Sequence, residues 1–197
     1  MLSSAQPESA PSLGKASLPH SLQALLRIST IQLVTVPDIH TSDEKLRQSR
    51  QRFGDYELFA SVIIETDGNI VIVRKSEQWG GGWSIPGGAV GGDEEIGASA
   101  LREVREESGI EAELSQPLAL VRTKIIAPNE GRLDYFLVVF RGRKIGGRLE
   151  PLDRDEIAEA RLATLPEVID LSSKGKFPSI HPHIDKPIID LCRSITP

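Results

Sequence analysis

One segment of the chain, residues 87–110 with the sequence GGAVGGDEEIGASALREVREESGI, places two glycine pairs directly before a strongly acidic stretch. Asp93 is expected to cap a helix whose first turn holds the next two glutamates, where carboxylates favour the positive end of the helix dipole. Gly109 is expected to end that helix in the left-handed conformation. The predicted helix therefore covers about residues 94–108 and follows a tight glycine loop.

The two sides of this helix differ in chemistry. At about 100° per residue, its apolar residues form one stripe that must pack against the rest of the fold. These residues are Ile96, Ala100, Leu101 and Val104. Glu103, Glu106 and Glu107 cluster beside the stripe at helical spacings of three and four, where like charges repel. Neutralisation by Arg102 and Arg105 on a solvated face is the simpler explanation, but it gives no reason for the glycine pairs or for acids bordering a packed face.

The remainder of the chain mixes strands and helices. Residues 58–66 and 69–75 are β-branched, apolar runs separated by Asp67-Gly68, which predicts a hairpin. Further strands are expected at 30–36, 118–126, 134–142 and near 158–162, and helices are expected at 21–28 and from near Thr164 and Asp185. This order predicts an α/β or α+β sandwich and not an all-helical bundle.

The length of 197 residues suits one domain of ordinary size with an extension. Residues 1–19 are rich in Ser, Pro and Ala, which predicts a disordered leader. Residues 20–55 are expected to form an N-terminal extension that could serve as a lid or as a contact in a homodimer. The principal domain is expected to cover residues 56–197.

Composition excludes several classes of protein. With 39% apolar residues, 26% charged residues and a net charge of −5, the chain resembles neither a disordered nor a membrane protein, and no global field attracts nucleic acid. Cys192 is the only cysteine and falls on an apolar helix face, so we expect a core residue, no disulfide and no cysteine-based metal site. His181 and His183 are expected in a surface loop. We therefore expect a cytoplasmic protein without a membrane or stable nucleic-acid partner.

The segment 88–110 resembles the signature of Nudix hydrolases, which reads Gly, five residues, Glu, seven residues, Arg-Glu, apolar, any, Glu-Glu, any, Gly, apolar. The specified positions are all filled here, by Gly88, Glu94, Arg102, Glu103, Val104, Glu106, Glu107, Gly109 and Ile110. WSIPGG, residues 83–88, is similar to the strand and loop that precede this signature in the family. The resemblance implies a Nudix-type α/β/α sandwich with a mixed central sheet and makes residues 56–197 a Nudix hydrolase domain.

The resemblance also implies a metal site. Glu103, Glu106 and Glu107 would hold one or more Mg²⁺ ions, for which Mn²⁺ could substitute, and the carbonyl of Gly87 would be a further ligand. Oxygen donors of this kind suit Mg²⁺, which binds through few protein ligands plus substrate phosphates. Glu103, Glu106 and Arg102 are the expected catalytic residues, with Arg102 orienting a carboxylate of the cluster.

The source of the general base stays open at this stage. Family members take it either from the helix, here Glu106, or from a later loop. The downstream candidates are Glu130, Glu150, Asp153 and Glu156.

The implied reaction is metal-assisted attack of water on a phosphorus of a diphosphate linkage in a nucleoside diphosphate derivative. ADP-ribose or another nucleotide sugar is weakly preferred, because Pro128 lies near the position where ADP-ribose-hydrolysing members carry a proline. Hydrolysis of oxidised or other nucleoside triphosphates is the close alternative, and dinucleoside polyphosphates are a further one. A non-catalytic nucleotide sensor is disfavoured, since a binder has little use for the intact acidic segment.

Several residues could contact the nucleotide-derived substrate. Arg74, Lys75 and Arg122 lie on predicted strands near the signature and could bind phosphate oxygens. Trp79, beside three glycines, is the candidate for stacking on a base, whereas Trp83 is expected to pack.

Overall fold

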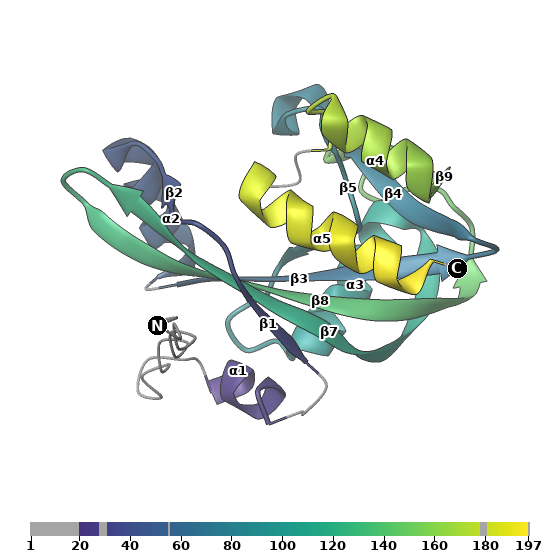
Figure 1. Cartoon of the computed structure of the whole chain (residues 1–197), viewed down its shortest axis with the longest axis horizontal. Coiled ribbons are helices and arrows are strands. Elements are labelled where there is room, and N and C mark those ends of the chain that lie inside the picture. Colours follow the sequence, from purple (N-terminus) through teal and green to yellow (C-terminus); the bar gives the residue numbers. More distant parts are fainter. Residues whose placement is uncertain (1–19, 28–30, 55, 178–180, 197) are drawn as a thin grey trace, which may run out of the picture.

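The computed structural model describes residues 20–27, 31–54, 56–177 and 181–196, so the expected leader at 1–19 lies outside the described residues. Helices cover both faces of a nine-stranded mixed sheet in which the main strand order is β1-β7-β8-β3-β4-β5 (Figure 1). The predicted α/β/α sandwich is confirmed. In the described part of the chain, every helix is too short or too polar to span a membrane.

The bounds of the elements are as follows. The strands are β1 (Gln32–Thr35), β2 (Ile39–His40), β3 (Tyr56–Thr66), β4 (Asn69–Lys75), β5 (Trp83–Ser84), β6 (Gly87–Ala89), β7 (Ile110–Ala127), β8 (Gly131–Gly147) and β9 (Ile157–Thr164). The helices are α1 (His20–Leu25), α2 (Asp43–Phe53), α3 (Ile96–Ser108), α4 (Leu165–Ser173), α5 (Pro182–Ile195) and the short 3₁₀ helix η1 (Glu77–Trp79).

β3 and β4 form a hairpin whose strands separate beyond the turn, and the signature segment pairs with β3 at the place where they have separated. Asp67 and Gly68 both have positive φ, 51° and 75°, as the predicted two-residue turn requires. β3 and β4 pair only next to this turn and then separate, so that β4 pairs with β9 and β5. β6 occupies the opened side of β3 in antiparallel register. The glycines of β6 therefore lie at the point where the two halves of the sheet diverge.

Two hydrophobic cores lie on opposite faces of the sheet. One face packs against α4 and α5, and its buried residues include Ile63, Val139 and Cys192. The other face packs against α1 and α3, and its buried residues include Val62 and Val104. β3 alternates between the two cores, which explains why its sequence is apolar at nearly every position.

The helix that carries the acidic signature begins two residues later than predicted. Glu95 is its N-cap without a side-chain capping bond, so the prediction that Asp93 caps the helix is wrong. Glu94 lies in the preceding turn because its carboxylate binds Arg102, two helical turns further on, and its N–H donates to the carbonyl of Gly91. The helix ends at Gly109, with φ 73°, as predicted.

The last helix also differs from the prediction, because it starts at Pro182 and not near Asp185. His181 is its N-cap, and its Nδ1 accepts a hydrogen bond from the N–H of His183 at 3.3 Å. The surface loop expected for the two histidines is therefore wrong. An imidazole nitrogen here takes the capping role that usually falls to Asp, Asn or Ser.

α2 was not expected from the sequence, and it secures the far end of the long β7–β8 hairpin. Ser42 caps it, accepting a hydrogen bond from the N–H of Lys45. The Asp43 carboxylate accepts hydrogen bonds from the backbone N–H groups of Asn129 and Glu130 in the hairpin turn. β1 and β2 run parallel to β7, so residues 32–40 belong to the same sheet as the strands that follow.

The thiol of Cys192 provides a test of this packing. The side chain is fully buried, and burial raises the pKa of the thiol to about 12. We expect the folded protein to react with a thiol reagent such as Ellman's reagent at pH 8 far more slowly than the guanidinium-unfolded protein, since the thiolate is the reactive form. Rapid stoichiometric labelling of the folded protein would show that the face of α5 that carries Cys192 does not pack against the sheet.

Candidate active site

The glycine pair of β6 allows the acidic helix to lie close to the sheet. A Cβ atom on Gly87 would lie 2.2 Å from Ser61 Oγ and 2.5 Å from the carbonyl oxygen of Ala60. A Cβ atom on Gly88 would lie 2.5 Å from Glu103 Oε1. The missing side chains at these two positions therefore leave the space that β3 and the Glu103 carboxylate fill.

Glu107 is the most deeply buried acid of the cluster, at 2% exposure. Its Oε2 accepts a hydrogen bond of 2.8 Å from the N–H of Gly87, and its Oε1 contacts the ammonium of Lys75. Burial raises the pKa of the Glu107 carboxyl to about 7, although Lys75 and Gly87 both favour the ionised form. The carboxylate is thus held at one place by two donors from different strands.

Lys75 joins the helix to the segment before β9. Its ammonium contacts both Glu107 and Glu156. Burial works to lower the pKa of this lysine, but the two carboxylates outweigh it and the pKa is raised. The same segment is fixed to the end of α3, where the N–H groups of Leu152 and Asp153 donate to the carbonyl of Glu106.

Arg102 organises the remaining acids. Its guanidinium donates to Glu94 through two nitrogens, at 3.1 Å each, and to Glu103 and Glu106 at 2.8 and 2.9 Å. The hydrogen bond to Glu94 is the first cause of its raised pKa. Burial raises the pKa of Glu103, against the opposing effect of Arg102. A single cation therefore holds three carboxylates in fixed relative positions.

The NUDIX domain family model matches residues 57–185, which include this entire cluster. The chain belongs to the Nudix family. Nudix enzymes use divalent metal ions and act on small nucleotide-derived substrates.

Two curated relatives share parts of this Nudix chain. "Nucleoside diphosphate-linked moiety X motif 6" of Xenopus laevis is 30% identical over 92 residues, which make up 47% of this chain and 39% of that protein. "Nudix hydrolase 10" of Arabidopsis thaliana is 46% identical over 55 residues, which make up 25% of this chain and 20% of that protein. The matched regions thus span well under half the length of either relative.

Solved structures share the Nudix fold. The E. coli ORF135 protein has a TM-score of 0.54 and 23% identity, covering 72% of this chain and 91% of that one. A MutT protein from Methanosarcina mazei has a TM-score of 0.54 and 21% identity, covering 71% and 94%. A UDP-X diphosphatase has a TM-score of 0.52 and 20% identity, covering 78% and 70%.

The structure brings some of the predicted site residues together. Glu103, Glu106 and Glu107 lie on one edge of α3 with Arg102, and Gly87 reaches the cluster through its N–H. That contact is made by the backbone nitrogen of Gly87, whereas the sequence had directed attention to its carbonyl.

Among the residues that the structure describes, the three predicted substrate-binding residues make no hydrogen bond or ion pair with the acids of α3, and their role in substrate binding stays a prediction. Arg74 is paired with Glu159 at 3.4 Å and also approaches Glu77. Arg122 donates to Thr35 on β1. Three strand spacings, about 14 Å, separate β7, where Arg122 lies, from β6. Trp79 is 52% exposed on η1.

Trp83 packs, as predicted from the sequence. Its side chain lies against the α5-side core. The guanidinium carbons of Arg161 and Arg74 lie 4.7 and 5.9 Å from the centre of its ring. The indole is therefore enclosed by cations of β4 and β9.

The structure separates the four downstream acids that could supply the general base. Glu130 pairs with arginines of α2, Glu150 pairs with Arg154, and Asp153 accepts hydrogen bonds from backbone N–H groups of its own loop. Glu156 alone among these four contacts Lys75 and through it the Glu107 carboxylate. Glu156 is thus the downstream acid that belongs to the cluster.

The donor set fits a divalent metal ion by its chemistry. Glu103, Glu106 and Glu107 supply hard oxygen donors on one helix edge, and the cations Arg102 and Lys75 already pair with them. Within the described residues, no group of three or more His, Cys, Asp or Glu side chains is close enough to form a metal cage. Metal binding would therefore require these carboxylates to turn from the cations towards one another.

A second polar group lies on the opposite face of the sheet and was missed from the sequence. Tyr135 is neighboured in register by Glu57 and Thr123, and all three are buried. The Tyr135 hydroxyl has no hydrogen-bond partner among the described residues, and burial raises its pKa well above the usual value. Cross-strand alignment of three polar residues on one face could have been recognised only with the strand register in hand.

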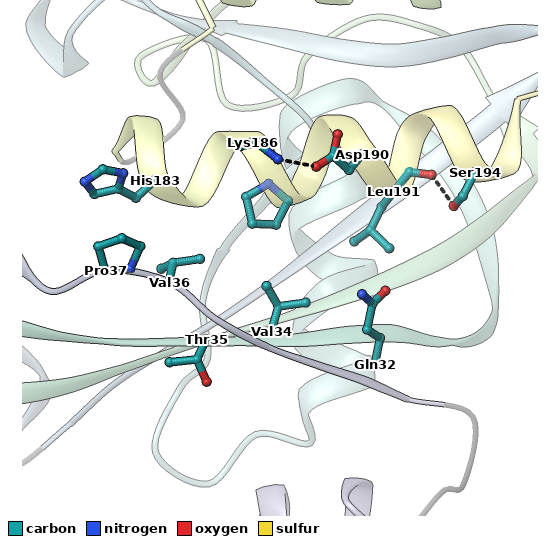
Figure 2. A pocket seen from close by; sticks show the side chains of 11 residues that line it. Gln32, Val34, Thr35, Val36, Pro37, His183, Lys186, Asp190, Leu191 and Ser194 are labelled. Carbon is teal, nitrogen blue, oxygen red and sulfur yellow. Dashed lines mark hydrogen bonds and ion pairs between the residues drawn. The ribbon is translucent and has the colours of Figure 1, made fainter. Parts of the chain in front are cut away.

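A pocket of about 570 Å³ lies between β1 and α5, on the face opposite α3 (Figure 2). Val34, Val36 and Leu191 form its apolar part, and the Lys186–Asp190 ion pair lies on its helical side. None of the signature residues lines it. Its size alone therefore does not associate it with the chemistry of the acidic cluster.

The buried carboxyl of Glu107 predicts a pH-dependent stability in metal-free buffer. The unfolded group titrates near 4.5 and the folded group near 7, so the folded protein binds the extra proton between these values. The free energy of unfolding should fall as the pH rises through this window. Relative to Glu107→Gln, the wild type should lose up to about 3 kcal/mol, at about 1.4 kcal/mol per pKa unit. Urea unfolding in EDTA at pH 5 and pH 8 measures the difference, and parallel profiles would contradict the assignment.

The two glycines of β6 predict different mutational effects. Gly87→Ala would place a methyl group against backbone atoms of β3, so it should destabilise the protein by about 1–3 kcal/mol. Gly88→Ala meets the end of the flexible Glu103 side chain, so its fold should survive while Mn²⁺ affinity falls. Thermal unfolding and Mn²⁺ titration by electron paramagnetic resonance compare the two variants. Equal stability loss in both would refute this distinction.

Proposed function

We propose that this Nudix protein is a Mg²⁺-dependent hydrolase that cleaves a diphosphate linkage in a nucleoside diphosphate derivative, with nucleotide sugars such as ADP-ribose as the preferred class. The observation that supports it is that Glu103 and Glu107 lie against the glycine pair of β6. Arg102 links Glu103 to Glu106, and Lys75 links Glu107 to Glu156. Acidic residues that serve only solubility stay exposed to water, whereas the Glu107 carboxylate is deeply buried.

Glu103, Glu106 and Glu107 would hold the metal, with the carbonyl of Gly87 as a further ligand. The ion would supply charge neutralisation for the phosphates and an activated water molecule. Without a cation, the acidic helix would repel a diphosphate, so the site requires one for substrate binding as well as for chemistry.

The protein's own residues supply orientation. Arg102 fixes Glu103 and Glu106, and the N–H of Gly87 fixes Glu107. Lys75 lies beside Glu107 and, once a metal takes over the carboxylates, its ammonium is free to bind a phosphate oxygen. Positioning of this kind accounts for most of the catalysis at phosphorus.

The general base must accept the proton of the attacking water while the bond between phosphorus and the leaving oxygen breaks. Glu156 is the downstream candidate, because Lys75 connects it to the cluster. Glu106 is the candidate within the helix, because its side chain is 45% exposed and therefore the most accessible of the three signature acids.

A nucleoside diphosphate derivative as substrate is supported by the name of the Xenopus laevis relative, which refers to a nucleoside diphosphate linked to an unspecified moiety X. Pro128 supports the preference for nucleotide sugars less than the sequence suggested. Its turn packs against α2 through Asn129 and Glu130, and the whole length of β7 separates it from α3. The homodimer, the cytoplasmic location and the lack of a stable nucleic-acid partner stay predictions, and light scattering after gel filtration measures the first.

A substrate panel with matched variants tests the proposal. Wild-type protein with Mg²⁺ should release a nucleoside monophosphate and a sugar phosphate from nucleotide sugars, detected by mass, and EDTA should stop the reaction. Glu106→Gln or Glu156→Gln, whichever removes the base, should lower kcat by about 10²–10⁴-fold. Glu150→Gln, an exposed acid of the same loop paired with Arg154, is the control and should keep full activity.

Three outcomes would change the assignment. Turnover of nucleoside triphosphates alone would favour the triphosphate pyrophosphohydrolase. Absence of product from every compound, with nucleotide binding retained, would favour the sensor module. Full activity in both the Glu106 and Glu156 variants would refute the roles given to these residues.

A further inference from the structure

A cavity of about 330 Å³ opens beside the glycine loop that leads into α3. Ala89, Val90, Gly91 and Gly92 form one wall, and Arg102 with Glu94 forms the side nearest the acids. The rest of the lining comes from the end of α2 and the start of β3, through Arg52, Phe53, Tyr56 and Leu58. Residues from the N-terminal region thus line, together with the signature loop, a space of small-molecule size.

The aromatic side chains of this lining are held in place from behind. Phe53 packs on Phe59 with ring centres 5.7 Å apart, and Tyr56 packs edge-on against Phe136 at 6.3 Å. Tyr56 still keeps 37% of its surface exposed. These rings therefore present supported apolar faces to the cavity without filling it.

Arg52 supplies a cation in the same part of the lining. Its guanidinium lies 4.9 Å from the centre of the Phe53 ring, which orients it as a flat, preordered donor. Among the lining residues that the structure describes, Arg102 is paired with Glu94, and Arg52 adds a further cation. A neutral apolar ligand would not use this arrangement, whereas one with hydroxyl and phosphate oxygens would.

Arg102 connects the cavity to the acids. The same guanidinium that lines the cavity donates to Glu103 at 2.8 Å and to Glu106 at 2.9 Å. A group bound here would lie close to these carboxylates, as a group attached directly to the diphosphate would. In a nucleotide sugar, that group on the side away from the nucleoside is the terminal sugar.

We propose that this cavity binds the terminal sugar of the nucleotide sugar, with Tyr56 and Phe53 against the ring carbons and Arg52 donating to its oxygens. The cavity has the volume to hold one phosphorylated monosaccharide. This inference rests on the proposed function and adds that the N-terminal region selects the substrate.

The test uses ribose 5-phosphate as a probe in buffer with Mg²⁺, where it has no diphosphate linkage to be cleaved, and follows the backbone amide signals by NMR. The probe should shift the signals of Gly91 and Gly92 in the wild type. Arg52→Gln should weaken binding about tenfold, as expected for loss of one hydrogen bond from a charged donor. Arg47→Gln removes the same charge from the same helix outside the cavity and should bind as the wild type does. Both arginines are exposed, so neither change should affect the fold.

Turnover gives a second readout. With Mg²⁺, Arg52→Gln and Tyr56→Ala should raise KM for ADP-ribose about tenfold, while KM for ATP, which has no terminal sugar beyond its phosphates, should change less than twofold. AMP, the nucleoside half of the substrate, should bind Arg52→Gln and wild type equally.

Failure of the sugar assignment can be distinguished from failure of the proposed hydrolase function. Equal binding of ribose 5-phosphate by the Arg52 and Arg47 variants, or shifts confined to other regions, would overturn the sugar assignment while hydrolysis stands. Weaker binding of AMP to Arg52→Gln would assign the cavity to the nucleoside half and also overturn it. Binding of ribose 5-phosphate through Arg52 in a wild type that hydrolyses no nucleotide would refute the proposed function and leave the sugar site in place.

Discussion

The burial of the Glu107 carboxylate constrains the rest of the site. A carboxylate at this depth is costly unless donors meet it, and the two donors come from β6 and β4, strands that belong to different halves of the opened sheet. The glycine at position 87 is what permits the first contact, because a side chain there would collide with β3. Burying the Glu107 carboxylate with two donors thus requires three features together. These are the divergence of β3 and β4, the glycine pair of β6 and the docking of α3.

Local patterns predicted the elements whose stabilising contacts are local. The Asp67-Gly68 turn, the Gly109 helix end and the apolar stripe of α3 all follow from backbone preferences or from periodicity, and the structure contains each of them. The start of α3 was predicted wrongly because Glu94 is drawn to Arg102, eight residues away, and capping rules do not consider such a partner. α2 had a signal in Ser42 and the two acids after it, but that signal went unused.

The candidate site shows the same division. The signature identified the acids of α3 directly, since helical spacing alone brings them together. It could not rank the downstream acids, because the choice of Glu156 depends on β9 pairing with β4 and bringing that carboxylate to Lys75. Arg74 and Arg122 were predicted from their places on strands near the signature, and in the structure they pair with Glu159 and Thr35. Arg52 and Tyr56 precede the signature by more than 30 residues, so only the folded arrangement relates them to it.

The contact between Lys75 and Glu156 joins residues 81 positions apart, and the strand that follows Glu156 is the last of the sheet to be made. A growing chain therefore contains the whole signature long before it has a complete catalytic centre. Contacts with such wide sequence separation form late in folding. A newly synthesised molecule would thus lack the contact between Lys75 and Glu156 until β9 has joined the sheet.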